Sequence, residues 1–312
     1  MGRIAIVTGA ASGIGQALAA ALVARGDTVV VADADKDGAE RTAGDLSERG
    51  PGAATAVAVD VRDADAVQAL VDQTRNRHGR LDLMVNNAGI GIGGETRELL
   101  LAHWDRVIDV NLRGVVHGVH AAYPVMVEQG SGHIVNTASL AGLLPSPGAT
   151  PYAMTKHGVV GLSLSLRAEA AQHGVRVTAV CPGVVDTPIL DKGGPDDLPK
   201  PAMSGHARGV LPARAAALLR PGPAGAGHPA GHRPQHRAGH RAGLGAGGLV
   251  PVAVRAAAGQ PDDRPPDRVG PRGFLRRAGF VAAMIAAAGR ADLSRRADAV
   301  PGLNSRVRGA GC

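Results

Sequence analysis

The stretch "VTGAASGIG" (7–15) places Gly9, Gly13 and Gly15 between a run of apolar β-formers and a run with helical spacing. A glycine-rich turn between a strand and a helix lets the backbone approach a pyrophosphate closely, and the helix N-terminus supplies unpaired N–H groups. The spacing differs from the usual G-x-G-x-x-G, so the glycines alone also fit an ordinary tight turn. The strand before them and the helix after them favour a dinucleotide site.

The residues around this turn alternate short β-branched segments with amphipathic ones, which is typical of a parallel sheet covered on both faces. Strands are predicted over residues 3–9, 28–33, 54–61, 81–89, 132–139 and 175–183, and helices over 13–26, 38–50, 64–79, 99–130 and 152–174. This order predicts an α/β fold with a doubly wound, Rossmann-like parallel sheet. The best candidate for a seventh strand is 248–254, where Pro251 interrupts the pattern, so completion of the sheet is doubtful.

Charge divides the chain into two parts. Residues 1–205 hold 17 Lys and Arg against 22 Asp and Glu, a balance of −5, whereas residues 206–312 hold 17 Arg against 5 Asp, a balance of +12; together they give the net charge of +7. We therefore divide the chain into a Rossmann-like domain over 1–205, which carries the candidate dinucleotide site, and a low-complexity tail over 206–312.

The composition of the predicted tail is unusual, because Arg, Gly, Pro and Ala supply 71 of its 107 residues. Such a segment buries too little apolar area to offset its ordering entropy, which predicts disorder. These residue types also have codons with only G and C in the first two positions, so we hypothesise a frameshift in a GC-rich gene. Resequencing codons 195–215 tests this, and a clean open frame there would contradict it.

Several classes of protein are disfavoured. No apolar run reaches the roughly twenty residues of a membrane span, no secretory signal precedes the first strand, and two cysteines make no disulfide framework. We therefore expect a cytoplasmic protein. The Arg-rich run 233–241 lacks aromatic residues for base stacking, so no specific nucleic-acid partner is expected. Histidines recur every four residues from His228 to His240, but Pro229 and Pro234 would break a helix there, and no metal site is predicted.

Asp33 ends the second predicted strand, twenty residues after Gly13. A carboxylate at this position accepts the adenosine-ribose hydroxyls and repels the 2′-phosphate of NADP. Ser12, Ala32 and Ala34 supply no cation for that phosphate, although Lys36 lies a little further on. NAD is therefore favoured over NADP.

Tyr152 and Lys156 are four residues apart in a predicted helix and so share one face. A nearby ammonium favours the phenolate and lowers a tyrosine pKa from about 10, which makes the pair suited to proton transfer with an alcohol. Ser139, at the end of the fifth predicted strand, suits a hydrogen bond to the same substrate oxygen. Asn111 is a polar residue in an apolar helix, where it suits a water that links Lys156 to solvent.

Together these motifs resemble the short-chain dehydrogenase/reductase family over roughly residues 3–200. The resemblance rests on Thr8-Gly9 to Gly15, on "NNAG" (86–89), on Tyr152 with Lys156, and on Pro182, Gly183 and Thr187. It implies a catalytic set of Asn111, Ser139, Tyr152 and Lys156. The cofactor-binding residues that we predict are Gly9, Ser12, Gly13, Ile14, Gly15, Asp33, Asp60, Val61, Asn87, Ala88, Gly89, Tyr152, Lys156, Pro182, Gly183, Val185 and Thr187.

Within this set, the resemblance places Asp60 and Val61 beside the adenine, Lys156 on the nicotinamide ribose, and Val185 and Thr187 at the carboxamide. It also implies a homodimer or homotetramer. The expected function is an NAD-dependent oxidoreductase acting on CH–OH groups, which interconverts a secondary alcohol and a ketone. The apolar, glycine-rich segments 89–95 and 140–149 suit a hydrophobic small-molecule substrate such as a steroid, terpenoid or acyl chain.

Two alternatives stay open. One is an NADPH-dependent ketoreductase of the 3-oxoacyl type. The other is a catalytically impaired dinucleotide-binding protein with a defective C-terminus.

Overall fold

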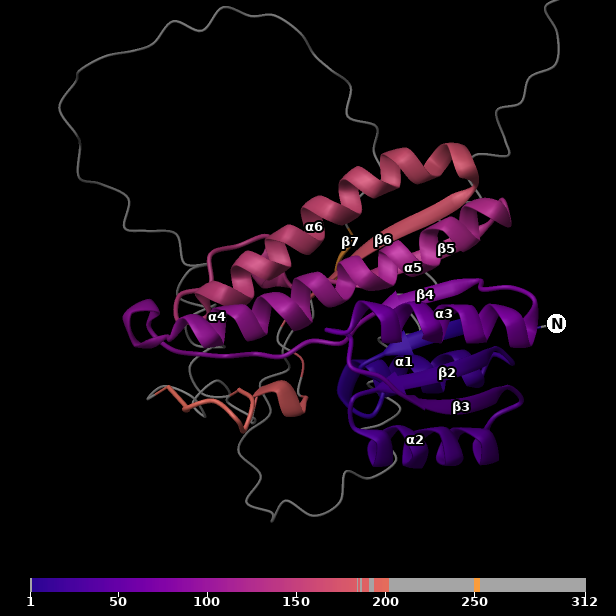
Figure 1. Cartoon of the computed structure of the whole chain (residues 1–312), viewed down its shortest axis with the longest axis horizontal. Coiled ribbons are helices and arrows are strands. Elements are labelled where there is room, and N and C mark those ends of the chain that lie inside the picture. The colour runs from indigo at the N-terminus through magenta and orange to yellow at the C-terminus, as the bar shows by residue number, and fades with distance from the viewer. Residues whose placement is uncertain (1, 184, 186, 191–193, 202–249, 253–312) are drawn as a thin grey trace, which may run out of the picture.

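The computed structural model describes residues 2–183, 185, 187–190, 194–201 and 250–252. Its strands form one parallel sheet in the order β3-β2-β1-β4-β5-β6-β7. Figure 1 shows the strands from β3 to β6 stacked in this order, with α2 beside β3. The strands are β1 (Ile4–Thr8), β2 (Thr28–Asp33), β3 (Ala53–Ala58), β4 (Leu83–Asn86), β5 (Gly132–Thr137), β6 (Val175–Pro182) and β7 (Val250–Val252).

Six α-helices connect the strands in the described part of the chain: α1 (Gly13–Val23), α2 (Lys36–Arg49), α3 (Ala64–His78), α4 (Leu101–Ile108), α5 (Gly114–Glu128) and α6 (Thr150–Ala170). A π-helical turn, η2 (Asp109–Arg113), joins α4 to α5. Short 3₁₀ turns include η1 (Thr96–Glu98), η3 (Leu140–Gly142), η4 (Ala171–His173) and η5 (Pro188–Leu190).

Alternate residues of the central strands face opposite layers, as the pleat of a β-strand requires. Ile6 and Met84 pack with α3, α5 and α6 in one buried cluster. Val7 and Val85 pack with α1 and α2 in a second cluster. The doubly wound α/β fold predicted from the sequence is thereby confirmed.

Two local features differ from the sequence-based expectation. The helix predicted over 99–130 contains the π-helical turn, and such turns are common at functional sites. The second is β7, which pairs in parallel with the end of β6 although Pro251 argues against a strand. A proline is tolerated there because β7 is the last strand of the sheet that the described residues form, and the outer edge of such a strand needs no donor.

The strand order reverses between β1 and β4. The strands that follow β1 in the chain, β2 and β3, lie on one side of it, and those that follow β4, β5 and β6, lie on the other side. Parallel sheets of this kind bind ligands outside the carboxyl ends of the strands at that reversal. The glycine-rich turn follows β1 and the "NNAG" stretch runs out of β4, so both lie at this edge.

The predicted domain boundary at 205 and nearly all of the predicted tail lie outside the described residues. None of the described helices combines the length and the apolarity that a bilayer crossing needs.

Candidate active site

The glycine-rich turn depends on the absence of side chains. Gly9 and Gly13 adopt positive φ angles of 65° and 57°, which disfavour any residue with a Cβ. A Cβ on Gly15 would collide with the carbonyl oxygen of Gly9. Ser12 occupies the N-cap of α1 without a side-chain cap bond, and Ile14 packs on the core beneath the turn. The first N–H groups of α1 therefore have no acceptor from the N-cap side chain, which fits a bound pyrophosphate.

Asp33 lies at the end of β2 and is tied to this turn. Its Oδ2 accepts a hydrogen bond of 2.9 Å from the backbone N–H of Ala11, and its Oδ1 accepts one of 3.0 Å from that of Asp35. Each carboxylate oxygen keeps lone pairs beyond these bonds. The half-buried carboxylate is thus held in place with acceptor capacity for two ribose hydroxyls.

The hydroxyl of Thr8 joins β1 to the "NNAG" stretch. It accepts the N–H groups of Asn87 at 3.0 Å and Ala88 at 3.1 Å, and it donates to the carbonyl of Val85 at 3.3 Å. The Asn87 amide donates back to the Thr8 carbonyl at 3.0 Å. Thr8 belongs to the sequence motif but is not among the predicted site residues; its place directly before Gly9 is the signal that could have found it.

Thr137, at the end of β5, is a second connecting residue that the sequence does not single out. Its hydroxyl donates to Asn87 Oδ1 at 3.3 Å, and its carbonyl accepts the ammonium of Lys156 at 2.7 Å. Only 3% of the Lys156 surface is exposed. This burial lowers the pKa of Lys156 to about 8, since a desolvated ammonium is disfavoured.

Tyr152 and Lys156 do meet on one face of α6, with Nζ of the lysine 5.6 Å from the centroid of the tyrosine ring. Burial raises the pKa of the Tyr152 phenol, while hydrogen bonding with the Ser139 side chain acts in the opposite direction. The lowering of the Tyr152 pKa that we expected from Lys156 does not dominate. The buried ammonium itself loses its proton at a lower pH than the phenol does. At neutral pH the chain alone therefore holds a neutral phenol beside a charged lysine.

Ser139 follows β5 and caps the 3₁₀ turn η3, where its Oγ accepts the N–H of Ala141 at 3.2 Å. This turn presses on α6: a Cβ on Gly142 would lie 2.6 Å from the Lys156 carbonyl oxygen. Gly142 is not among the residues predicted from the sequence. The contact fixes the serine relative to the helix that carries Tyr152 and Lys156.

Asn111 is fully buried in the π-helical turn, and its amide binds the backbone of Ile90 twice. Oδ1 accepts from the Ile90 N–H at 2.8 Å, and Nδ2 donates to the Ile90 carbonyl at 2.9 Å. Thr155 lies 3.5 Å from Nδ2 and donates to the Tyr152 carbonyl at 2.8 Å. Oδ1 keeps one lone pair that is free to accept a hydrogen bond from a water. The relay water itself stays a prediction.

Asp60 and Val61 follow β3. The Asp60 carboxylate accepts from Nε of Arg62 at 2.8 and 3.0 Å, and these hydrogen bonds are the main cause that lowers the pKa of Asp60. Val61 is buried, and its carbonyl lies 2.9 Å from Nδ1 of His117. The Arg62 partner is an addition to the sequence-based set.

The remaining predicted cofactor residues reach the same edge. A Cβ on Gly89 would lie 3.3 Å from Asn111 Oδ1 and 3.6 Å from Lys156 Nζ. A Cβ on Gly13 would lie 3.3 Å from Thr187, which brings the segment after β6 to the glycine-rich turn. Three residues lead from β6 toward this contact, namely Pro182, Gly183 and Val185.

No cluster of three or more His, Cys, Asp or Glu side chains that could hold a metal ion lies among the described residues. The histidines from 228 to 240 lie outside those residues.

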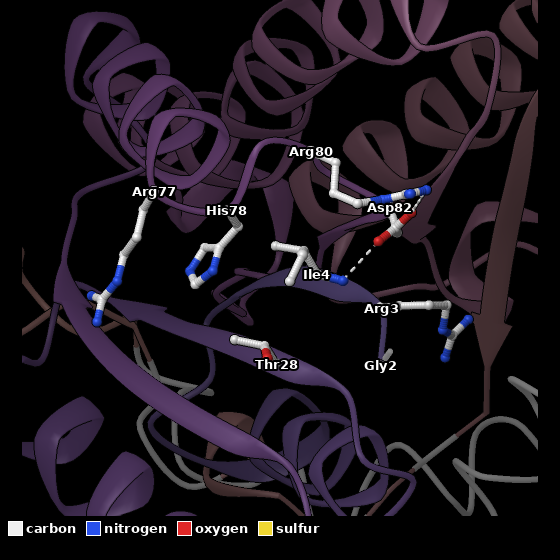
Figure 2. Close-up of a pocket in the computed structure, with 8 residues that line it drawn as sticks. All are labelled: Gly2, Arg3, Ile4, Thr28, Arg77, His78, Arg80 and Asp82. Atoms are coloured by element: carbon white, nitrogen blue, oxygen red, sulfur yellow. Dashed lines mark hydrogen bonds and ion pairs between the residues drawn. The ribbon is translucent and has the colours of Figure 1, made fainter.

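A hollow opens at the opposite, amino-terminal edge of the sheet. Figure 2 shows its lining residues, which are Gly2, Arg3, Ile4, Thr28, Arg77, His78, Arg80 and Asp82. Two of its three arginines are engaged by acids, Arg3 by Asp27 at 2.7 Å and Arg80 by Asp82 at 2.8 Å. Asp82 also accepts the Ile4 N–H at 2.8 Å, so these pairs fasten the start of β1.

Comparison with known proteins agrees with the geometry at the carboxyl edge. The short chain dehydrogenase family profile matches residues 3–197. The 3-oxoacyl-(acyl-carrier-protein) reductase FabG of Thermotoga maritima is 37% identical over 196 residues, which cover 61% of this chain and 77% of that protein. Levodione reductase of Leifsonia aquatica is 39% identical over 191 residues, covering 61% of this chain and 72% of the relative.

A crystal structure of levodione reductase superimposes with a TM-score of 0.59 at 38% identity, over 61% of this chain and 74% of that one. The family binds nicotinamide dinucleotides and consists of oxidoreductases. The glycine-rich turn, the acidic end of β2 and the Tyr152–Lys156 pair are all contained in the matched residues. The chain belongs to the short-chain dehydrogenase family.

Proposed function

We propose that this protein is an NAD-dependent dehydrogenase that interconverts a hydrophobic secondary alcohol and its ketone. The observation that carries the proposal is the contact of the half-buried Tyr152 with the buried Lys156, with Ser139 held beside the phenol. Burial matters because the electrostatic interactions that stabilise the charges formed during proton transfer are stronger where water is excluded.

Each catalytic side chain has a separate task in this proposal. The nicotinamide ring supplies the hydride for ketone reduction when it is bound. Tyr152 donates its phenolic proton to the carbonyl oxygen as the new C–H bond forms, and Ser139 donates a hydrogen bond to the same oxygen. The Lys156 ammonium then stabilises the phenolate. Alcohol oxidation uses the same groups in reverse, with Tyr152 accepting the hydroxyl proton.

NAD is the proposed cofactor because the charged groups near Asp33 leave little for a 2′-phosphate to bind. Lys36 lies 3.8 Å from Glu40, and Arg41 lies 4.0 Å from Asp35, so both nearby cations have acidic partners. The Asp33 carboxylate itself would repel a phosphate and accept ribose hydroxyls.

The alternative with support is an NADPH-dependent ketoreductase of the 3-oxoacyl type, because a 3-oxoacyl-(acyl-carrier-protein) reductase is among the relatives. A catalytically impaired dinucleotide-binding protein is the other alternative, and it would bind cofactor without turnover.

Titration of the full chain with NADH and with NADPH, followed by nucleotide fluorescence, tests the cofactor. NADH should bind more tightly than NADPH. Asp33→Asn keeps the acceptor for Ala11 but removes the charge, so it should bring the two affinities closer together. Asp37→Asn, an exposed acid in the first turn of α2, is the matched control. Preferential binding of NADPH by the wild type would contradict the proposal.

A panel of hydrophobic secondary alcohols and their ketones then separates an active dehydrogenase from an impaired one. Turnover with NAD supports the proposed reaction, and binding without turnover favours the impaired protein. Segments 89–95 and 140–149 are the proposed pocket walls.

We also propose that the protein is a homodimer or homotetramer, because exposed apolar side chains lie on α5 and α6, among them Val116 and Leu164. The proposed location is the cytoplasm.

A further inference from the structure

Residues 194–201 pack against the loop formed by residues 90–95, which we call the wall loop. A Cβ on Gly94 would lie 3.0 Å from Cβ of Pro201, and a Cβ on Gly194 would lie 3.4 Å from Ile92. Pro201 and Ile92 are buried. The 194–201 segment therefore supports the wall loop from outside.

The wall loop is also held from the catalytic side. Asn111 binds the backbone of Ile90, and the N–H of Gly94 donates to the Gly148 carbonyl at 2.9 Å. These bonds fix both ends of the loop, and the packing of Pro201 against Gly94 adds a contact from the 194–201 segment.

His103 of α4 attaches the 194–201 segment to the body of the protein. Its ring is 2% exposed, and its Nδ1 accepts the N–H of Leu100 at 3.1 Å. Because Nδ1 is the acceptor, we assign the proton to Nε2, which donates to the Pro199 carbonyl at 2.8 Å. One imidazole thus caps the start of α4 and holds the segment.

Arg106 lies one turn further along the same face of α4. Its two terminal nitrogens bind the two carboxylate oxygens of Asp197 at 3.0 and 2.6 Å, which is a bidentate pair. The arginine side chain is only 23% exposed, whereas that of Asp197 is 62% exposed. The helix side of this pair is therefore the better fixed one.

The same charges connect the segment to the predicted adenine position. Hydrogen bonding by Arg106 holds the pKa of the Asp197 carboxyl below its usual value, and the charge of Arg62 acts in the same direction. The pKa of Asp60 is affected mainly by Arg62 and more weakly by Arg106.

We propose that His103 and Arg106 are positioning residues for substrate binding: they hold the 194–201 segment against the wall loop without touching the reacting atoms. The proposal rests on the proposed dehydrogenase function. It predicts that loosening the segment raises KM for the alcohol or ketone more than it lowers kcat. The reason is that Tyr152, Ser139 and Lys156 are fixed by contacts within β5, η3 and α6.

Arg106→Gln, Asp197→Asn and His103→Ala test the proposal in the full chain. The substrate is whichever secondary alcohol or ketone the wild type turns over. We expect KM to rise about two- to fivefold when the partly exposed Arg106–Asp197 pair is broken and about tenfold for His103→Ala, with kcat changing less than about twofold. The exchanged pair, Arg106→Asp with Asp197→Arg, should recover part of the loss. Arg113→Gln removes a pair with Asp109 that does not touch the segment and is the matched control.

Hydrogen–deuterium exchange of residues 194–200 in the cofactor-free chain gives a readout that needs no turnover. Exchange should be faster in Arg106→Gln and His103→Ala than in the wild type or Arg113→Gln. Unchanged exchange in both variants, or faster exchange with unchanged KM, would overturn the proposal. If the wild type turns over no alcohol or ketone, the proposed function fails, and the exchange rates alone then decide whether α4 anchors the segment.

Discussion

Asn111 and Ile90 form a two-bond pair in which one side-chain amide satisfies both polar groups of one backbone residue, at 2.8 and 2.9 Å. The pair fastens the chain leaving β4 to the π-helical turn before α5. A leucine of similar size would leave the N–H and the carbonyl of the half-buried Ile90 without these partners.

Asn111→Leu should therefore lower the free energy of unfolding by about 1–3 kcal/mol for each group that finds no new partner. Urea unfolding followed by circular dichroism measures the loss. A midpoint equal to the wild type would show that the amide is dispensable for the fold.

Tyr152→Phe removes the phenolic proton but keeps the ring beside Lys156. Turnover should fall by about 10²–10⁴-fold, the usual contribution of a positioned acid or base, while NADH affinity stays within a few-fold of the wild type. Tyr123→Phe is the matched control, because Tyr123 of α5 packs edge-on against His173. Retained activity in Tyr152→Phe would refute the assignment.

Lys156, a catalytic residue in the proposed function, also affects the stability of the fold. Its pKa of about 8 in the folded chain lies below the ordinary 10.5, so folding releases a proton between these values and stability from this group increases as pH rises from 8 to 10.5. Lys156→Met should therefore stabilise the cofactor-free chain near pH 7. The gain should reach at most about 1.4 kcal/mol for each pH unit that separates the two pKa values, less the lost bond to Thr137.

That advantage of Lys156→Met should shrink toward pH 10, and the variant should be inactive. Chemical unfolding at several pH values, together with an activity assay, gives both results. A difference between variant and wild type that does not vary with pH would contradict the titration of Lys156 in this range.

His133, on β5, titrates in the opposite part of the pH scale. Burial, and then the charges of Arg176 and Arg3, lower the pKa of His133 from 6.5 to about 3, so the folded chain keeps this ring neutral. The unfolded chain takes up the proton first as pH falls, and stability from this group is lost between pH 6.5 and 3 at about 1.4 kcal/mol per pH unit.

His133→Gln should flatten that part of the acid unfolding curve while it keeps a polar partner for the Thr178 hydroxyl, which lies 2.9 Å from Nε2. His120→Gln, which alters an exposed histidine, is the matched control. Equal slopes in all three proteins would exclude His133 as the titrating group.

Two glycines offer a paired test of the cofactor turn. A Cβ on Gly15 would meet the Gly9 carbonyl oxygen, whereas a Cβ on Gly161 of α6 would meet nothing within 4 Å. Gly15→Ala should abolish NADH binding or folding, and Gly161→Ala should stabilise the chain by about 0.5–1 kcal/mol. NADH titration and thermal unfolding of both variants check this, and normal NADH binding by Gly15→Ala would contradict the predicted role of the turn.

The positions of β1 to β6 and the meeting of Tyr152 with Lys156 are predictable from the sequence, because hydrophobic periodicity and four-residue helix spacing are local properties. The π-helical turn within the helix from 99 to 130 is not, since the apolar pattern hardly changes across Asp109–Arg113. Pro251 argues against a strand only as long as the position of that strand in the sheet is unknown. A proline costs little in an edge strand and much in a central one, and the sequence does not show which strand lies at the edge.

Contacts between distant parts of the chain are beyond sequence reasoning. His103 with Pro199 and Arg106 with Asp197 are separated by 96 and 91 residues, and no local pattern marks either pair. The raised pKa of Tyr152 escapes prediction for a related reason: helix spacing shows that a lysine is near, but only the packed structure shows that both groups are desolvated.

The hydroxyl of Thr8 has a consequence for the energetics of ligand binding. Its acceptor and donor capacity is used by Asn87, Ala88 and Val85, all within the chain. The conformational entropy of ordering this edge is therefore lost during folding and not when a dinucleotide arrives. A preorganised site of this kind keeps more of its contact energy as affinity.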